Sequence, residues 1–272
     1  MTIGILYVCT GQYTMFWKEF YLSFKDRFCP NLEKKFFVFT DSQNLIFKEN
    51  EDVKIIYQER LGWPYDTLMR FSMFDRAKDE LEKCDFIYFF NANMICEQVI
   101  KEEDILPNVE FGQNLVVVKH PGYMNKKIKY CPLERNKNSL AYIQYNKGQH
   151  YVCGGVNGGT ARAYLELIEV LKKNIDIDLK KNIIALVHDE SHLNRYILNR
   201  DDVRYLTPEF CNPDDLNINF EKKIRLLDKN IYLNINNIKN INKEKMLQKW
   251  IRRINKYSRG YFGNIRDCLL GK

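Results

Sequence analysis

The sequence predicts an α/β protein whose main domain is built on a mostly parallel sheet. Short runs of Val, Ile, Phe and Tyr recur through residues 1–118, and such runs are typical of buried strands. Between them, apolar residues return every three or four positions, which is the spacing of a buried helix face. Parallel neighbours need a crossover connection, usually a helix, so this alternation favours helices that cover a parallel sheet.

Four strands and two helices are expected in the first hundred residues. The strands are predicted at residues 3–8, 36–39, 53–57 and 86–90. Phe16, Phe20 and Phe24 recur at four-residue spacing and predict the first helix. A second helical pattern runs over residues 68–81, with most of its apolar residues on one side.

Polar residues follow three of these strands. Thr10 comes after the first strand, Asp41 after the second, and Asn91-Ala92-Asn93 after the fourth. Ligands of open α/β sheets bind beyond the carboxyl ends of the strands. We therefore expect these residues to share one edge of the sheet and to mark a binding site.

The second half of the chain is less regular. A strand is predicted at residues 115–118 and a helix at 161–172, with a Tyr- and Lys-rich section between them that is expected to form loops over the site. The apolar run at 183–187 indicates a buried strand or helix end. From residue 233 on, an Asn-rich linker leads into a basic tail. The expected organisation is a domain at 1–232 and an extension at 233–272.

The positive charge of the chain belongs to its C-terminal part. Residues 222–272 hold fourteen basic and three acidic residues, a net charge of +11, so the first 221 residues carry −4 of the total of +7. An apolar stripe flanked by Lys and Arg runs from Met246 to Ile254, as in a helix that lies on an anionic membrane. A helix docked on the protein with a solvated basic face fits this stripe equally well.

The cysteines and apolar runs bear on the compartment. Eight cysteines are scattered without a CxxC pair or a Cys/His cluster, which argues against a zinc site and favours a reducing cytoplasm. No apolar run approaches the roughly 20 residues that span a bilayer. We expect a cytoplasmic protein with peripheral contact at the inner face of the cell membrane.

The segment of residues 187–196 is the strongest candidate for chemistry. His188, Asp189 and Glu190 follow the apolar run directly, and such groups against an apolar wall are paired or used. An ordinary helix start is the alternative. In that interpretation Asp189 caps the helix, His192 is solvated, and Leu193, Tyr196 and Ile197 form the buried face.

Several motifs together resemble glycosyltransferase family 6, the family of the histo-blood-group A and B transferases and their bacterial relatives. They are HPGYM at 120–124, LERN at 133–136 with AYIQ at 141–144, GGVNGG at 154–159, VHDESHLNRY at 187–196 and LTPEF at 206–210. The strings ILYVCTG, VFTDS, LGWP and FFNAN are similar to those of the bacterial, metal-independent branch. The resemblance covers roughly residues 1–230.

The resemblance implies a fold and a reaction. The fold is a nucleotide-sugar-binding domain of the GT-A type. The reaction moves N-acetylgalactosamine or galactose from its UDP ester, in α1,3 linkage and with retention of configuration, to a galactose-terminated glycan. A bacterial glycolipid or lipopolysaccharide precursor is a natural acceptor. Retention is compatible with a covalent intermediate or with attack of the acceptor from the front face.

The resemblance also assigns roles to residues by position. Glu190 matches the catalytic glutamate, as nucleophile or stabiliser. Tyr13 matches the aromatic residue near the uracil, Arg70 a donor-sugar ligand and His120 an acceptor ligand. The implied donor-binding set is Val8, Cys9, Thr10, Tyr13, Arg70, Asn91, Asn93, Gly154, Gly155, His188, Asp189 and Lys229. The implied acceptor-binding set is His120, Val187 and Glu190.

Asn91 and Asn93 stand where related transferases carry the two aspartates of a metal-binding motif. Neutral amides are poor ligands for a hard dication, so we expect no metal ion and no other cofactor. A lysine can neutralise the departing diphosphate instead. Lys229 matches such a lysine of bacterial relatives, although it also fits as one more lysine in a basic tail.

Two further positions bear on specificity. In the family, glycine at the position of Gly155 leaves space for an N-acetyl group, which favours N-acetylgalactosamine over galactose. Val187 replaces the family tryptophan and Pro132 a threonine, both at the acceptor side, so a need for fucose does not carry over.

Two other classes of function stay open at this point. The basic tail is compatible with a protein that binds nucleic acid or a membrane. The domain is also compatible with a catalytically inactive glycan-binding module.

Overall fold

The computed structural model describes residues 1–233, and the chain divides into the units Met1–Lys229 and Asn230–Lys272. The expected Asn-rich linker and basic amphipathic tail lie outside the described residues apart from Leu233. The following description concerns the first unit. No helix within residues 1–233 combines the length and the apolar character that a bilayer crossing requires.

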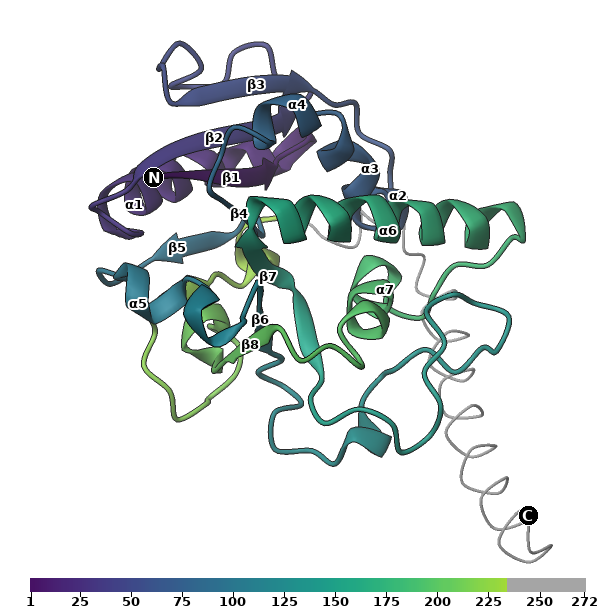
Figure 1. The fold of residues 1–272 in the computed structure, drawn as a ribbon. Coiled ribbons are helices and arrows are strands. Elements are labelled where there is room, and N and C mark those ends of the chain that lie inside the picture. The colour runs from purple at the N-terminus through teal and green to yellow at the C-terminus, as the bar shows by residue number, and fades with distance from the viewer. Residues whose placement is uncertain (234–272) are drawn as a thin grey trace, which may run out of the picture. The chain divides into compact units, whose positions relative to one another are not determined.

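A seven-stranded sheet forms the centre of the domain (Figure 1). Its strands, in spatial order, are β3 (Val53–Tyr57), β2 (Glu33–Thr40), β1 (Thr2–Val8), β4 (Phe86–Phe90), β7 (Val152–Thr160), β6 (Leu115–Lys119) and β8 (Val203–Leu206). The first four are mutually parallel, as are β6 and β8. Only β7 runs antiparallel to its neighbours, so the sheet is mostly parallel as predicted.

A small second sheet lies beside the edge where the candidate site residues gather. It consists of β5 (Met94–Cys96), β10 (Ile224–Leu226) and β9 (Asn212–Pro213). Because β10 pairs with β5 immediately after the Asn91-Ala92-Asn93 segment, the end of the domain is carried back to that segment.

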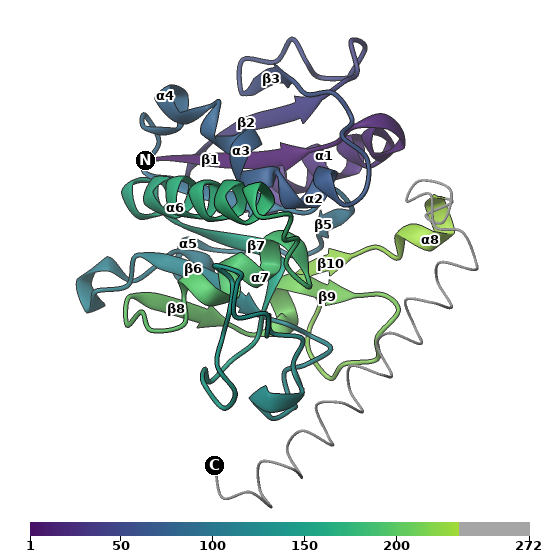
Figure 2. The ribbon, with the colours of Figure 1, turned by 90° about the vertical axis from the view of Figure 1, so that its right-hand side faces the viewer.

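Helices cover both faces of the large sheet (Figure 2). The α-helices are α1 (Trp17–Arg27), α2 (Tyr65–Leu68), α3 (Arg70–Asp75), α4 (Lys78–Leu81), α5 (Glu102–Ile105), α6 (Ala161–Lys180), α7 (His188–Tyr196) and α8 (Lys229–Tyr232). Four 3-10 helices complete the set: η1 (Gly11–Phe16), η2 (Val109–Phe111), η3 (Ile128–Tyr130) and η4 (Pro208–Cys211).

The alternation of side chains along the strands divides the core into two layers. Ile3, Ile5 and Tyr7 of β1 face the aromatic side of α1, which supplies Trp17, Phe20 and Phe24. Leu6 and Phe89 face the other side, where α3 and α6 supply Phe71, Phe74, Leu167 and Ile168. The continuous apolar runs of the sequence are therefore strands that are buried on both faces.

The five predicted strands of the large sheet are confirmed, and the predicted helix at 161–172 extends to Lys180. The helical pattern at 68–81 is instead broken into α2, α3 and α4, with turns at Met69 and Ala77. Arg70, Phe71, Met73 and Phe74 are all buried. All four belong to α3, which packs against α6 in the second core layer.

Two other expectations need correction. The run at 183–187 is neither a strand nor a helix but a loop that delivers Val187 as the residue before α7. The Gly-rich segment 152–160, in contrast, is a strand. Its glycines admit close neighbours, because a Cβ on Gly158 would lie 2.3 Å from the Tyr88 ring.

Candidate active site

The start of α7 packs against the backbone of β7, and this contact builds the centre of the site. The Gly154 N–H donates to Oε2 of Glu190 at 2.7 Å. Asn194, one turn further along the helix, bonds both the N–H and the carbonyl of Val152 at 3.0 and 2.9 Å. A Cβ on Gly154 would lie 3.1 Å from the Cβ of Glu190. The missing side chain therefore lets the helix approach the strand this closely.

Glu190 is held on both of its carboxylate oxygens. Gly154 occupies Oε2, and the hydroxyl of Tyr151 donates to Oε1. Burial raises the pKa of Glu190 to about 7, against the lowering effect of these two hydrogen bonds. Burial and the neighbouring carboxylate raise the pKa of Tyr151, so its hydroxyl remains a donor. The carboxyl group thus has a fixed orientation and titrates near neutral pH, which suits a reacting group.

Arg70 and Asp189 form a buried ion pair beside Glu190. One guanidinium nitrogen of Arg70 lies 2.7 Å from Oδ2 of Asp189 and 3.0 Å from the Gly154 carbonyl. The guanidinium also stacks on the Phe89 ring at 4.1 Å. Burial raises the pKa of Asp189, and Arg70 opposes that effect. Such a pair is costly to break, so it fixes the first turn of α7 relative to the sheet.

His188 adopts an unusual backbone conformation at the first position of α7. Its φ is 51°, in the left-handed region that residues other than glycine rarely adopt. Its ring meets Trp63 edge to face, with centroids 4.5 Å apart. Strain of this kind persists where the surroundings hold a residue in a functional position. Trp63 therefore supports the site, although the sequence marked it only as part of a motif.

The interpretation of α7 as an ordinary helix start is wrong in two respects. The residue before the helix is Val187, so Asp189 is not its cap. His192 is only 1% exposed, and burial lowers its pKa to about 4, so it is neither solvated nor charged at neutral pH. Leu193 and Ile197 are buried, as that interpretation required.

An aromatic cluster connects His120 with Glu190. The rings of His120, Tyr123 and Tyr151 lie 4.9 to 5.5 Å apart, and Tyr151 bonds Glu190. Nδ1 of His120 accepts from the Gly122 N–H at 3.1 Å, and burial lowers the pKa of His120 to about 4. The neutral ring therefore carries its proton on Nε2, which can donate to a hydroxyl group.

The residues after β1 form a second part of the site. The Gly11 N–H donates to the carboxylate of Asp41 at 2.8 Å, which confirms that these two strand ends share one edge. Tyr13 and Val8 are half-buried, and Thr10 is nearly buried. The Cys9 side chain is wholly buried in the core, where burial raises its pKa to about 12. The Cys9 side chain therefore belongs to the core cluster that includes Trp17 and Phe20.

Asn91 and Asn93 have different environments. Asn91 is half-buried and lies against Gly155, because a Cβ on Gly155 would be 2.6 Å from its amide nitrogen. Asn93 is 3% exposed, and its side-chain amide donates to the Leu227 carbonyl at 2.6 Å. In return, the Leu227 N–H donates to the backbone carbonyl of Asn93 at 2.9 Å. The Asn93 amide therefore tethers the chain near residue 227.

This tether places Lys229 at the site. Two residues beyond Leu227, the Lys229 ammonium lies 5.9 Å from the centroid of the Tyr13 ring. The structure thus brings Lys229, Tyr13 and the 91–93 segment to one region. Within residues 1–233 no group of three or more His, Cys, Asp or Glu side chains is arranged to hold a metal ion.

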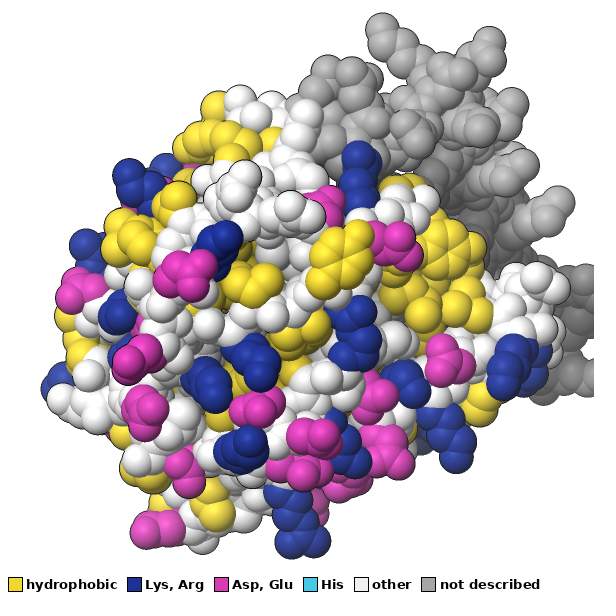
Figure 3. Space-filling view, turned by 90° about the horizontal axis from the view of Figure 1, so that it is seen from above, with side chains coloured by type: hydrophobic (Ala, Val, Ile, Leu, Met, Phe, Trp, Pro, Cys, Tyr) yellow, Lys and Arg dark blue, Asp and Glu magenta, His cyan; other side chains and the backbone are white. Residues whose placement is uncertain are grey.

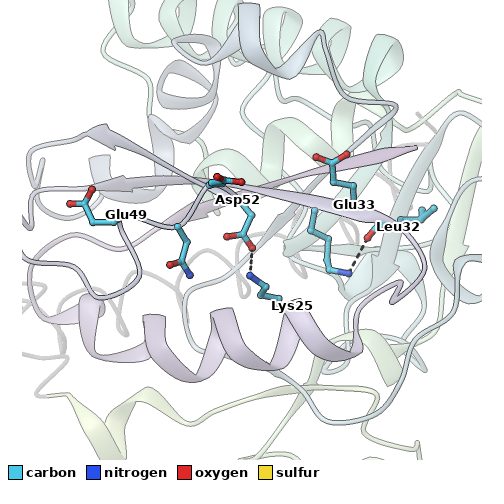
Figure 4. A pocket seen from close by; sticks show the side chains of 8 residues that line it. Lys25, Leu32, Glu33, Glu49 and Asp52 are labelled. Atoms are coloured by element: carbon cyan, nitrogen blue, oxygen red, sulfur yellow. Dashed lines mark hydrogen bonds and ion pairs between the residues drawn. The ribbon is translucent and has the colours of Figure 1, made fainter.

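A separate cavity of about 690 Å³ lies away from these residues (Figure 4). It is lined by residues 25, 32–34 and 49–52, which include the Lys25–Asp52 ion pair at 2.8 Å. Residues 33 and 53 begin β2 and β3, so this cavity is at the amino ends of the parallel strands. Ligands of such sheets bind at the opposite edge, and the cavity is therefore not part of the candidate site.

One bonding partner in the site was not expected from the sequence. Tyr151 directly precedes β7 and is outside the motifs, and its role appears only when its hydroxyl is seen on Glu190. Its position three residues before Gly154, the first glycine of the double-glycine motif, is the sole sequence signal. The structure therefore adds Tyr151 and Trp63 to the expected site residues.

Replacement of Tyr151 by Phe is expected to shift the pH dependence of activity. The hydroxyl lowers the pKa of Glu190, so its removal raises that pKa above its value of about 7. If the ionised carboxylate is the active form, the acidic limb of the kcat profile then moves to higher pH. The measurement is kcat against pH for both proteins. A profile that loses amplitude without moving would contradict this role, and Tyr123→Phe is the matched control.

Comparison with known proteins gives a family match over the whole domain. The family model for glycosyltransferase family 6 matches residues 1–240. The O-antigen biosynthesis glycosyltransferase WbnI of Escherichia coli is 42% identical over 197 residues, which cover 72% of this chain and 82% of that protein.

Vertebrate proteins are more distantly similar. The globoside alpha-1,3-N-acetylgalactosaminyltransferase 1 of Gallus gallus and the histo-blood group ABO system transferase 1 of Rattus norvegicus are each 25% identical over 77% of this chain. The chain spans about three fifths of their length, 61% and 60%. The family match extends over the whole domain that carries Glu190, Arg70 and His120. The chain therefore belongs to glycosyltransferase family 6.

Proposed function

We propose that this glycosyltransferase moves N-acetylgalactosamine, with galactose as the second donor, from the UDP-sugar to a galactose-terminated glycan in α1,3 linkage. Configuration is retained and no metal ion takes part. The observation that carries the proposal is Glu190, held on both oxygens by Tyr151 and Gly154 between the Arg70–Asp189 pair and His120. Glycan chemistry of this kind fits the names of the relatives.

Each part of the site has a role in this proposal. Thr10, Tyr13 and the Val8 end of β1 hold the nucleotide. His188, Asp189 and Arg70 bound the donor sugar on one side and Asn91 on the other, while the protonated Nε2 of His120 faces the acceptor hydroxyl. Glu190 is the carboxylate that stabilises the anomeric carbon as its bond to UDP breaks. Both a glycosyl ester on Glu190 and a front-face attack of the acceptor satisfy this arrangement.

Lys229 supplies the positive charge at the departing diphosphate. The tether from Asn93 to Leu227 supports this role, because it delivers the ammonium group to the edge that holds Tyr13. A lysine acts there as a point charge on phosphate oxygens. Positions 91 and 93 carry amides, so this segment supplies no carboxylate ligand for a dication.

The proposal is tested by turnover of each UDP-sugar with a panel of galactose-terminated acceptors, in EDTA and in Mn²⁺. We expect UDP-N-acetylgalactosamine to be used faster than UDP-galactose, with an unchanged rate in EDTA and an α1,3-linked product. Absence of acceptor-dependent UDP release would favour an inactive glycan-binding module. Salt-sensitive DNA binding in place of turnover would favour a nucleic-acid-binding protein.

Gly155→Ala is expected to reverse the donor preference. The new methyl group would lie 2.6 Å from the Asn91 amide nitrogen, so either the amide is displaced or the methyl group takes space beside the donor sugar. We expect the ratio of kcat/KM for N-acetylgalactosamine over galactose to fall by about tenfold to 100-fold, in line with the cost of filling a pocket by one methyl group.

The double variant Asn91→Ala with Gly155→Ala separates two causes of this effect. If the displaced amide blocks the sugar, the double variant recovers use of N-acetylgalactosamine. If the methyl group itself fills the pocket, the reversal persists. An unchanged donor ratio in the single variant would show that Gly155 does not set the preference.

A further inference from the structure

The loop segment of residues 121–151 concentrates positive charge on the acceptor side of the domain. It contains the basic residues Lys126, Lys127, Lys129, Arg135, Lys137 and Lys147. All five lysines are exposed. The one acidic residue of the segment, Glu134, is buried and accepts hydrogen bonds from the N–H groups of Asn136 and Leu186. The solvent-facing charge of the segment is therefore entirely positive.

The remainder of the domain is different in charge. The segment carries +5 while the first 221 residues as a whole carry −4, so the other residues in that range carry −9. On the face seen from above, basic and acidic side chains are interspersed (Figure 3). For example, the single carboxylate of Glu80 lies within ion-pair distance of three lysines, Lys35, Lys54 and Lys83. Within the described part of the chain, the five lysines of the loop segment take part in no ion pair.

Exposed aromatic side chains accompany these cations. Tyr130 is 60% exposed and Tyr145 is 49% exposed. The Lys129 ammonium lies 5.0 Å from the Tyr130 ring centroid, and the Arg135 guanidinium lies 4.4 Å from that of Tyr145. Tyrosine beside Lys and Arg is typical of surfaces at the level of lipid headgroups, where the ring is amphipathic and the cations meet phosphate.

The segment is fixed to the domain although it consists mostly of loops. Cys131, Leu133, Ile143 and Tyr151 form a small core of their own. The Asp178 carboxylate of α6 accepts from the Ser139 hydroxyl at 2.5 Å and from the Leu140 N–H at 2.9 Å. Because its shape is set by these contacts, the segment presents its charge in one arrangement at the lower end of the domain in Figure 1.

The charged surface adjoins the candidate acceptor site. The Lys126 ammonium lies 4.7 Å from the centroid of the Tyr123 ring, and that ring lies 4.9 Å from the ring of His120. Any surface that bound this segment would therefore lie next to the acceptor side of the enzyme. This last step rests on the proposed function, whereas the charge of the surface does not.

We propose that residues 121–151 dock the protein on an anionic phospholipid membrane. The lysines contact headgroup phosphates, Tyr130 and Tyr145 enter the headgroup layer, and His120 faces the lipid surface. An acceptor glycan anchored in that membrane is then presented to the site from the membrane side.

The test measures binding of the full chain to lipid vesicles without donor or acceptor. The vesicles contain phosphatidylcholine alone or with about 30% phosphatidylglycerol, which gives a surface attractive to lysine. The loop variant carries Lys127→Ala, Lys129→Ala and Lys137→Ala, three exposed lysines of the segment that do not contact the His120 cluster. The control variant carries Lys18→Ala, Lys78→Ala and Lys181→Ala, which remove the same charge from exposed positions elsewhere.

We expect the full chain to bind only the anionic vesicles, and the loop variant to bind them on the order of 100-fold more weakly, at roughly fivefold per lysine. The control variant keeps its affinity, and both variants keep full turnover of a water-soluble acceptor. The proposal is overturned if the loop variant binds like the original chain, if both variants weaken equally, or if RNA displaces the protein from the vesicles through the same lysines. None of these outcomes depends on turnover, so a failure of the proposed function is seen separately.

Discussion

Glu190→Gln is expected to lower kcat by about 10³-fold, the range that a reacting carboxylate contributes. The amide is nearly isosteric and its oxygen can still accept from the Gly154 N–H, so the first turn of α7 keeps its place. What is lost is the negative charge at the anomeric carbon. Steady-state turnover measures the effect, and the affinity for UDP, which does not contact Glu190 in the proposed mode, should stay the same.

Glu190→Gln should also change how the stability of the protein depends on pH, which loss of a catalytic group alone would not do. The folded-state pKa of Glu190 is raised to about 7 from 4.5, so this group contributes stability below pH 4.5 that is lost as the pH rises through 7. Glu190→Gln removes the group from this titration. The Tm of the variant minus that of the original protein should therefore be larger at pH 8 than at pH 5. A variant that is inactive but less stable at pH 8 would show misfolding instead of a missing carboxylate.

Lys229→Ala is expected to lower the transfer rate by about 10²- to 10³-fold in EDTA, as for loss of one preorganised group at a developing charge. Lys229→Arg should recover part of this rate, because the charge remains while the shape of the donor group changes. The matched control is Lys222→Ala. Lys222 is also in the C-terminal part of the domain, but its ammonium pairs with Asp214 at 3.0 Å.

The two causes of such a loss can be separated. Loss of charge at the diphosphate lowers kcat with every UDP-sugar, and small primary amines should restore part of the rate of the alanine variant. An enzyme whose original form has no activity in EDTA, and in which Lys229→Ala behaves like Lys222→Ala, would contradict the proposal. In that case the positive charge at the diphosphate has another source.

The sequence predicted most of the large sheet because its strands are buried on both faces. Runs such as residues 3–8 and 86–90 are apolar without interruption, which few other structures allow. The strand β7 was not predicted because its four glycines oppose strand formation when considered alone. They are required by neighbours distant in the sequence, such as the Tyr88 ring against Gly158.

The site was predicted only in part, because some of its contacts join residues that are far apart in the sequence. The motif around Glu190 is local and was recognisable. Arg70 and Asp189 are 119 positions apart, and Asn93 and Leu227 are 134 apart, so neither pairing follows from local spacing. The resemblance assigned Asn93 to ligand binding because its position matched a motif. In the structure its side-chain amide also donates to a backbone carbonyl that no pattern in the sequence indicates.

The hydrogen bond from Asn93 to Leu227 requires an amide at position 93. An amide can donate to a carbonyl, whereas an ionised aspartate in the same place would set two acceptors 2.6 Å apart with no proton between them. A carboxylate at 93 would therefore release the chain that positions Lys229. Asn93→Asp alone would thus loosen this anchor without building a metal site, because position 91 keeps its neutral amide.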